Sequence, residues 1–491
     1  MKIVIGYPPL ENKNKIPQIS QNRQFQWTTG GMLSYYIYPV VPAYAASLLK
    51  QKNYAVFWLD GLAEKMSYEQ WKKKLLAIQP DILAIETKTP VVKYHWEIIN
   101  DLKKFQISNF KFQIVLMGDH VTALPEESMQ NSLVDFVITG GDYDFSLLSI
   151  ANHLSKGDNL ESGIWYREDQ KYFCSGNFKL DHSLDELPLI DRNLTKWELY
   201  SYKNSNFYRA PGAYTMFGRD CWWGKCTFCS WTTLFPGNKF RAMSVKKAVA
   251  EVENLVENYQ VKEIMDDSGS FPVGDWLREF CEEIIKRGYQ KKTRINCNMR
   301  FNSGLTQKDY DLMGRAGFRF ILYGLESASQ TTLDRLKKNL KVEQIEPALW
   351  MAKKAGLQPH VTVMVGYPWE KEEEINKTIC FIKDLFNKGL VDTMQATIVI
   401  PYPGTPLFGE CKKKGWLKTR DWNKYDMAAP VMKAGVSDER LLGAVRDLYS
   451  ASIWNKTFIL NTFKQLKSID GVKYVSFQGL KYFGKLLEFT S

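Results

Sequence analysis

Three cysteines stand within nine positions of one another near the middle of the chain. Four residues separate Cys221 from Cys226, and two separate Cys226 from Cys229. Thiolates at this spacing suit a soft, thiophilic metal centre. Structural zinc normally has four protein ligands, and three local thiolates without a fourth fit a [4Fe–4S] cluster with one open iron. A zinc site with a distant ligand and a chance grouping of thiols are the alternatives. No obvious partner pair exists among Cys174, Cys281, Cys297, Cys380 and Cys411.

The cysteine loop follows the first of six units in which a strand pattern precedes a helix pattern. The predicted strands are 213–219, 262–270, 293–300, 319–327, 358–368 and 394–406, and the predicted helices are 245–259, 275–288, 306–317, 342–356 and 373–389. Six units are fewer than the eight of a closed (β/α)8 barrel, so we expect a partial, open barrel. Its site should lie at the carboxyl ends of the strands, where the cysteine loop begins.

The first 150 residues also alternate strand and helix patterns. Apolar strands are predicted at 2–8, 54–61, 81–87, 112–118 and 134–141, and helices at 39–53, 67–79, 92–105 and 143–153. Buried strands separated by helices predict a parallel, doubly wound α/β sheet. Such sheets bind ligands beyond the carboxyl ends of their strands.

These patterns divide the chain into four parts. We expect a doubly wound domain at 1–154, a connector with a small hairpin at 163–176 within 155–207, the partial barrel at 208–410 and a helical C-terminal region at 411–491. Aromatic residues alternate with lysines over 471–489. A helix docked on the barrel is the ordinary interpretation of that segment, and a membrane-surface helix is the alternative.

Composition limits the class of protein. The chain has 491 residues, 45% of them hydrophobic and 24% charged, which is typical of a globular protein with two or three domains. It contains neither an apolar run long enough to span a membrane nor a signal-peptide pattern, so we expect a cytoplasmic protein. The net charge of +11 comes from scattered lysines. No nucleic-acid-binding motif accompanies them, so we interpret them as a solvated surface.

The barrel and its cysteines resemble the radical S-adenosylmethionine (SAM) superfamily. In that superfamily three cysteines after the first barrel strand hold a [4Fe–4S] cluster, usually with three and then two residues between them. Here the first gap is four, which predicts a loop that bulges at Gly224 and turns one tryptophan toward the cluster. The resemblance implies that Phe228, the residue before Cys229, stands near the adenine of SAM.

The resemblance also implies SAM contacts at the ends of the later strands. In "MDDSGSF", Asp266, Asp267 and Ser268 would accept hydrogen bonds from the SAM ammonium, although a capped helix start explains the same residues.

Three further strand ends match in order. The resemblance implies that Asn298 and Arg300 reach polar groups of SAM, and that Glu326 and Ser327 meet its ribose or carboxylate. Gly366 would let the backbone approach the adenine. No single one of these segments is specific to the superfamily, but the set of strand ends in this order is.

The first domain, with "DELPLIDR" after it, resembles the cobalamin-binding domain that precedes the barrel in one class of this superfamily. The cobalt-ligating Asp-x-His-x-x-Gly pattern is absent, as it is in many members of that class. The family's Gly-Gly-x-His is Met117-Gly118-Asp119-His120 here, and its Gly-Glu-x-Glu is 141–144, Gly-Asp-Tyr-Asp. The resemblance implies cobalamin contacts at Gly118, His120 and Gly141, whereas Met117 and Tyr143 put bulk where a nucleotide tail needs glycine.

The resemblance implies an enzyme that cleaves SAM reductively to a 5′-deoxyadenosyl radical. A cobalamin-dependent C-methyltransferase acting on an unactivated carbon is the first hypothesis. Cyclisation, rearrangement or C–C coupling on the same architecture is the second, and an iron–sulfur electron carrier or sensor is the third. The expected partners are a small-molecule, lipid or peptide substrate and a reductant such as flavodoxin or ferredoxin. The sequence does not rank the substrates.

Overall fold

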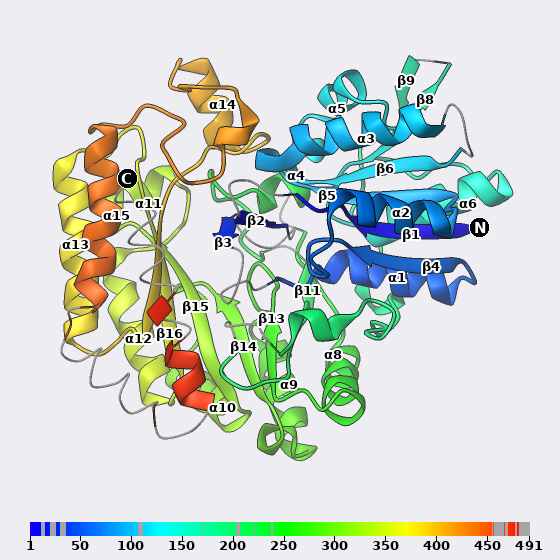
Figure 1. Ribbon diagram of the computed structural model, residues 1–491. Helices are drawn as coiled ribbons and strands as arrows, with labels where there is room; N and C mark the ends of the chain where they lie inside the picture. Colours follow the sequence, from blue (N-terminus) through cyan, green and yellow to red (C-terminus); the bar gives the residue numbers. More distant parts are fainter. Residues whose placement is uncertain are drawn as a thin grey trace.

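The computed structural model describes residues 1–10, 15–19, 26–29, 36–106, 111–169, 171–202, 207–219, 221–236, 239–453, 455, 466, 470–476 and 479–480. They form two α/β units, each built on its own sheet, with helical segments after the second (Figure 1). The predicted fold class is confirmed.

The first sheet has seven strands in the order β4-β1-β5-β6-β7-β8-β9. The first five of these positions are parallel, and β8 and β9 are antiparallel additions to one edge. Each predicted apolar strand is present and largely buried. The seven strands of this sheet are β1 (Lys2–Tyr7), β4 (Ala55–Asp60), β5 (Ile82–Thr87), β6 (Gln113–Gly118), β7 (Phe136–Ile138), β8 (Ile164–Glu168) and β9 (Lys171–Cys174).

Helices cover both faces of this sheet, as in a doubly wound fold. Alternate residues of the strands point to opposite faces, so Ile3 and Ile5 pack with α1 (Val40–Gln51) and α6 (Tyr143–Lys156). Val4 packs on the other face with α2 (Tyr68–Ile78) and α3 (Val92–Gln106). Ser67 caps α2, because its hydroxyl accepts a hydrogen bond from the Gln70 amide.

Three elements of the first unit differ from the sequence prediction. The segment after β6, expected as a loop, forms two short helices, α4 (Asp119–Ala123) and α5 (Pro125–Asn131). The loop after β1 contains a hairpin, β2 (Lys15–Gln18) with β3 (Gln26–Thr29). The hairpin expected in the connector is present as β8 and β9, but it extends the first sheet instead of standing apart.

The second sheet has six parallel strands in the order β10-β13-β14-β15-β16-β17. Its order follows the chain without a reversal, which is the topology of an open, partial barrel, as predicted. The strands are β10 (Gly212–Thr215), β13 (Glu263–Asp266), β14 (Arg294–Met299), β15 (Phe318–Glu326), β16 (Gln358–Val365) and β17 (Thr393–Ile398). A short antiparallel pair, β11 (Gly218–Arg219) with β12 (Arg241–Ala242), flanks the cysteine loop.

Amphipathic helices cover the outside of the barrel (Figure 1). Their apolar residues, such as Leu277 and Phe280, join the barrel core, and their other faces are charged. The helices after β11 are α7 (Trp231–Leu234), α8 (Val245–Glu253), α9 (Asp275–Lys286), α10 (Gln307–Arg315), α11 (Gln330–Arg335), α12 (Ile345–Lys354), α13 (Glu372–Asn387), α14 (Pro406–Lys413) and α15 (Asp438–Ile453).

Only part of the predicted C-terminal helical region falls on described residues. Helix α15 packs against α13 and β17. Residues 470–476 are helical, and Tyr474 lies against Tyr208 with ring centroids 5.3 Å apart. The guanidinium of Arg319 lies 5.8 Å from the Tyr474 ring. This short piece therefore docks on the barrel, and most of 477–489 lies outside the described residues. In the part of the chain that the structure describes, no helix is both long enough and apolar enough to cross a bilayer.

Candidate metal and cofactor site

The cysteine loop runs from the end of β11 to α7, at the carboxyl end of the barrel sheet. Gly224 has a φ of +59°, in the left-handed region that residues with a Cβ avoid. The chain therefore absorbs the additional residue between Cys221 and Cys226 by turning at Gly224, as the spacing predicts.

Two backbone hydrogen bonds hold this loop on the barrel. The Thr227 amide donates to the Leu336 carbonyl at 3.0 Å, and the Leu407 amide donates to the Thr227 carbonyl at 2.8 Å. The loop is thus clamped between the turn after α11 and the start of α14.

The three thiols lie close enough to influence one another electrostatically. Burial raises the pKa of the Cys226 thiol, while the charges of Lys338 and Arg300 act to lower it. Burial also raises the pKa of Cys229, and negative charge on Cys226 and Cys221 adds to that shift. Among the described residues, no three potential ligands converge as they would around a single metal ion. A [4Fe–4S] cluster is larger and takes its thiolates on different irons, so three neighbouring thiols beside two cations fit a cluster.

Arg300 connects the thiols to the tryptophans of the loop. Its Nη1 lies 3.6 Å from Cys226 Sγ, and its Nη2 donates to the Lys338 carbonyl. The guanidinium carbon lies 5.3 Å from the ring centroids of both Trp222 and Trp223. Both tryptophans therefore lie against the side chain that contacts Cys226, and the orientation of one of them toward the cluster stays a prediction.

Glu326 and Lys338 form a buried ion pair at the end of β15. Lys338 Nζ donates to Glu326 Oε1 at 2.8 Å, and both side chains are less than a tenth exposed. Glu326 has a φ of +66°, an unusual backbone for a residue with a Cβ, and its side chain lies close to Gly324. Sequence reasoning found Glu326 but missed Lys338, because "RLKKN" has the appearance of a charged, exposed turn.

Ser327, the next predicted residue, points to a second buried carboxylate. Its hydroxyl donates to Glu370 Oε1 at 2.8 Å, and the Thr332 hydroxyl donates to the same atom at 2.9 Å. Burial raises the pKa of Glu370 to about 7. Sequence reasoning assigned no role to Glu370, which stands four residues after Gly366.

The polar residues after β13 are occupied by backbone groups of the cysteine-loop entrance. Asp266 accepts hydrogen bonds from the amides of Phe217 at 2.7 Å and Ser268 at 3.2 Å. Ser268 Oγ accepts from the Gly218 amide at 2.8 Å. Burial raises the pKa of Asp266 to about 7. Here these two side chains hold the strand that leads into the cysteine loop.

Asp267 and Asn298 lie beside this entrance. Asp267 is fully buried, and its amide donates to the Thr215 carbonyl at 2.8 Å. Asn298 Nδ2 donates to the Ser268 carbonyl at 2.8 Å. Asn298 Oδ1 is buried and accepts no hydrogen bond from the described residues. Asn298 therefore retains an acceptor for a polar ligand, such as an ammonium group.

Phe228 borders a small apolar cluster, whereas Gly366 lies against the main core. Phe228 packs against that cluster, which includes Leu336, Tyr367 and Leu407. Gly366 has a φ of +100°, and a Cβ there would contact Leu441 of α15 at 3.2 Å. The position requires a glycine because the backbone has a positive φ there and because α15 approaches it closely.

The predicted cobalamin-contacting residues Gly118 and His120 lie at the carboxyl end of β6. Gly118 has a φ of +142°, and a Cβ there would collide with the Thr87 carbonyl. His120 is fully buried, its ring centroid is 5.2 Å from that of Trp422, and its Nε2 is 3.3 Å from Glu127 Oε2. His120 thus packs inside the protein and presents no nitrogen to an open surface.

The third predicted contact, Gly141, is covered by another part of the chain. A Cβ at Gly141 would collide with the ring of Phe235, just after α7. The bulky side chains of Met117 and Tyr143 are fully buried. Gly141 is therefore packed against Phe235, and the cobalamin contact that the resemblance implies for this glycine is not open in this packing.

A buried ionic network joins the cysteine loop to the first unit. Arg219 Nη1 donates to Asp144 Oδ1 at 2.9 Å and to Asp142 Oδ1 at 3.0 Å. Arg241 Nη1 lies 2.7 Å from Asp142 Oδ2. Burial alone would raise the pKa of Asp142, but Arg219 and Arg241 outweigh it and lower that pKa. Arg219, two positions before Cys221, is thus tied to the start of α6 in the other unit.

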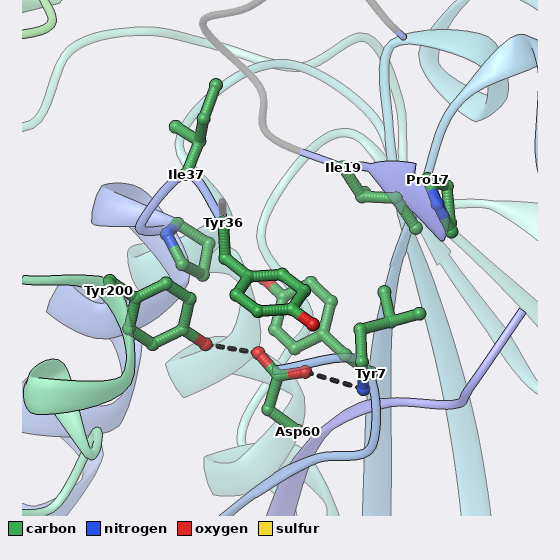
Figure 2. Close-up of a pocket in the computed structure, with 9 residues that line it drawn as sticks. Tyr7, Pro17, Ile19, Tyr36, Ile37, Asp60 and Tyr200 are labelled. Atoms are coloured by element: carbon green, nitrogen blue, oxygen red, sulfur yellow. Dashed lines mark hydrogen bonds between the residues drawn. The ribbon is translucent and has the colours of Figure 1, made fainter. Parts of the chain in front are cut away.

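A small pocket lies at the carboxyl ends of β1 and β4, and Figure 2 shows Tyr200 pointing at Asp60 within it. Asp60 accepts a hydrogen bond from the Tyr200 hydroxyl and another from the Leu62 amide at 2.9 Å. Burial raises the pKa of Asp60 to about 6. The cavity has a volume of about 20 Å³, which is enough for one water molecule. Its lining is Tyr7, Pro17, Ile19, Tyr36, Ile37, Pro39, Asp60, Leu62 and Tyr200.

Comparisons with known proteins agree with this geometry. The model of the radical SAM superfamily matches residues 215–382, which include the cysteine loop and the four barrel strands β13 to β16. An uncharacterised methyltransferase of Pyrococcus horikoshii is 28% identical over 88% of this chain and 88% of its own. The anaerobic magnesium-protoporphyrin IX monomethyl ester cyclase of Rubrivivax gelatinosus is 26% identical over 87% of this chain and 76% of its own.

Two solved structures share the fold over nearly the whole chain. OxsB, a cobalamin-dependent SAM radical enzyme solved with aqua-cobalamin and SAM, has a TM-score of 0.71 at 16% identity, covering 99% of this chain and 71% of OxsB. The radical SAM methyltransferase TsrM of Kitasatospora setae, solved with cobalamin and a [4Fe–4S] cluster, has a TM-score of 0.68 at 13% identity and covers 99% of both chains. At these identities the likeness shows the architecture.

Proposed function

We propose that this chain, a member of the radical SAM superfamily through residues 215–382, is a C-methyltransferase that acts on an unactivated carbon. The observation that carries the proposal is the group of three cysteines beside Arg300 and the Glu326–Lys338 pair at the carboxyl end of the barrel. An electron carrier or sensor needs the cysteines but has no use for buried polar groups arranged beside them.

The cysteines and their neighbours would hold the cluster. Cys221, Cys226 and Cys229 would supply three thiolates, and the positive charges of Arg300 and Lys338 favour the thiolate form of Cys226, which burial disfavours. When bound, the cluster and SAM supply one-electron cleavage of the sulfonium and a carbon radical.

Other residues of this site would bind and orient SAM. Lys338 and Glu326 offer a cation and an anion to the SAM carboxylate and ammonium, and Asn298 Oδ1 offers a further acceptor. Both charged side chains are less than a tenth exposed, so water is largely excluded from them and their electrostatic interactions are strong.

Methyl transfer is favoured by the proteins that this chain resembles. The relative from Pyrococcus horikoshii is named a methyltransferase, and so is TsrM, which shares the architecture over the full chain. A corrinoid as the methyl carrier belongs to this proposal. Because Phe235 packs against Gly141, such a corrinoid would bind without a contact at Gly141.

A second candidate uses the same SAM site without a corrinoid. A radical SAM cyclase or rearrangement enzyme needs no methyl carrier, and one relative is named a cyclase. Both candidates share the SAM site and differ in their products and metal content.

Anaerobic assay of the purified protein tests these candidates. We expect the reduced, cluster-loaded protein to convert SAM to 5′-deoxyadenosine, and the Cys226→Ser variant to lose this reaction. A methyltransferase also yields S-adenosylhomocysteine and purifies with cobalt, whereas the second candidate yields neither. Absence of 5′-deoxyadenosine from the loaded protein would contradict both.

The setting and partners are part of the same proposal. All eight cysteines are unpaired, which suits a reducing, cytoplasmic compartment. An electron-carrier protein such as flavodoxin or ferredoxin would supply the electron. The substrate would be a small molecule, a lipid or a peptide.

A further inference from the structure

Tyr367 has a buried hydroxyl group without a hydrogen-bond partner among the described residues. Its side chain is fully buried at the carboxyl end of the barrel sheet, two residues after β16 ends. Buried polar groups of folded proteins almost always have a partner, because leaving a buried donor unpaired is costly. The hydroxyl is therefore a donor that is available to a bound ligand.

Packing fixes the ring that carries this hydroxyl. The ring of Tyr367 stacks on that of Trp369, with centroids 5.5 Å apart and planes inclined by 17°. It also belongs to the apolar cluster of Leu336 and Leu407, against which Phe228 of the cysteine loop packs. Because a ring packed in this way cannot carry its hydroxyl out to solvent, the partner has to come to the hydroxyl.

Three neighbouring strands of the barrel place this hydroxyl near the cysteine loop. Arg300 follows β14, Glu326 ends β15 and Tyr367 follows β16, so the three residues lie along one edge of the sheet. Burial raises the pKa of the phenol, and negative charge on Glu326, Glu370 and Cys226 adds to that shift. The hydroxyl thus lies within electrostatic range of two carboxylates and of one thiol of the loop.

Other donors already occupy the two carboxylates. Glu326 accepts a hydrogen bond from Lys338 at 2.8 Å. Glu370 accepts hydrogen bonds from the hydroxyls of Ser327 and Thr332. Neither carboxylate accepts one from the phenol. Of its three anionic neighbours, the remaining one is the thiolate, and a bound cluster adds further sulfur acceptors beside it.

We propose that the Tyr367 hydroxyl donates a hydrogen bond to a sulfur atom of the [4Fe–4S] cluster beside Cys226 and raises the reduction potential of that cluster. This inference rests on the proposed function, because it assigns a further residue to the cluster that the same site would hold. A hydrogen bond to sulfur stabilises the reduced cluster, which is the more negative one, and its loss lowers the potential. Tyr367 thus sets how readily the cluster accepts an electron.

A redox titration of the cluster-loaded protein in the absence of SAM tests this assignment. Tyr367→Phe keeps the ring and removes only the hydroxyl. We expect the equilibrium constant for reduction of its cluster to fall about tenfold, which lowers the midpoint potential by about 59 mV for a one-electron step. An unshifted potential in Tyr367→Phe would overturn the hydrogen bond to the cluster.

Tyr425→Phe is the matched control for this titration. Tyr425 is fully buried, and its hydroxyl donates to the Thr419 carbonyl at 3.0 Å. We expect the potential of this variant to equal that of the unmodified protein. A shift of the same size in both variants would mean that the potential responds to any lost buried hydroxyl, and it would also overturn the proposal.

Unfolding of the cluster-free protein in urea separates a ligand-binding hydroxyl from a structural one. We expect Tyr367→Phe to be as stable as the unmodified protein or more stable, because it removes a donor without a partner in the described chain. Tyr425→Phe loses a hydrogen bond and should unfold at a lower urea concentration. Equal losses of stability in the two variants would show that the Tyr367 hydroxyl serves the fold, against the proposal.

SAM binding and cleavage complete the test. We expect Tyr367→Phe, loaded with cluster, to bind SAM in equilibrium dialysis as the unmodified protein does. Weaker SAM binding with an unshifted potential would identify an oxygen of SAM as the acceptor and overturn the assignment to sulfur. If the unmodified, loaded protein shows the potential difference from Tyr367→Phe but forms no 5′-deoxyadenosine with dithionite, the proposed function fails and the hydrogen bond stands.

Discussion

Arg219 donates a hydrogen bond from each of its terminal nitrogens to the two carboxylate oxygens of Asp144. Both side chains are fully buried between the two units. Arg219 belongs to β11, two residues before the first cysteine, and Asp144 belongs to the first turn of α6. The pair therefore fixes the entrance of the cysteine loop relative to the first sheet.

Loss of this pair should destabilise both units together. Arg219→Met leaves Asp144 buried without its main partner, and removing one member of a buried ion pair typically costs about 3–5 kcal/mol. We expect a corresponding fall in the free energy of unfolding in urea, with less iron retained after cluster loading. Arg287→Met, in an exposed pair on α9, is the control and should leave both measurements unchanged. Equal behaviour of the two variants would contradict a structural role for Arg219.

Each loop cysteine should be required for iron binding. Replacing Cys221, Cys226 or Cys229 by serine removes one thiolate, so we expect iron and sulfide per chain to fall to a small fraction of the unmodified content. Cys380→Ser removes an exposed thiol from α13 and serves as the control. Full iron content in any of the three loop variants would exclude that cysteine as a ligand.

The turn at Gly224 should resist substitution. Gly224→Ala forces a Cβ into the left-handed region at a cost of about 1–2 kcal/mol. We expect poorer cluster retention, measured as the rate of iron loss to a chelator. Gly409→Ala on α14, where a Cβ meets nothing within 4 Å, is the matched control. Slow iron loss from Gly224→Ala would show that the bulge is not needed.

The Glu326–Lys338 pair should determine affinity for SAM. Lys338→Met removes a cation that touches Glu326 at 2.8 Å and acts on Cys226, so we expect SAM binding to the loaded protein to weaken at least tenfold. Equilibrium dialysis of Lys338→Met, Glu326→Gln and the double variant measures the coupling. Additive losses would mean that the two side chains act separately on SAM.

Ionisation of Glu370 should make stability depend on pH. Its pKa is raised to about 7 in the folded protein, from an ordinary value near 4.5. The folded state thus holds the proton more tightly than the unfolded state, and stability falls as the pH rises from about 4.5 to about 7. At pH 8 the loss is at most on the order of 3 kcal/mol.

Glu370→Gln keeps an acceptor for Ser327 but cannot ionise, so its free energy of unfolding should change less between pH 5 and pH 8. Glu373→Gln, at an exposed position of α13, is the control and should follow the unmodified protein. Identical pH profiles for Glu370→Gln and the unmodified protein would contradict the raised pKa.

Local sequence patterns predicted the strands, the helices and the cysteine loop. Apolar runs such as 82–87 are buried strands because a parallel sheet is covered on both faces. The turn at Gly224 was also predictable, since an additional residue in a loop of fixed span must bulge and glycine tolerates the required backbone. Short helices such as α4 and α5 were not, because their few residues carry no periodicity.

Only the tertiary structure decided which polar side chains face the site. Asp266 and Ser268 stand at a strand end, as SAM-binding residues would, yet the backbone amides of Phe217 and Gly218 occupy their oxygens. Lys338 gave no signal in the sequence, yet it lies buried between Glu326 and the thiols. The sequence by itself determined the elements and the three cysteines, because periodicity and spacing are local properties. Burial and partner choice depend on residues far apart in the chain, as with Arg219 and Asp144, and only the folded packing determines them.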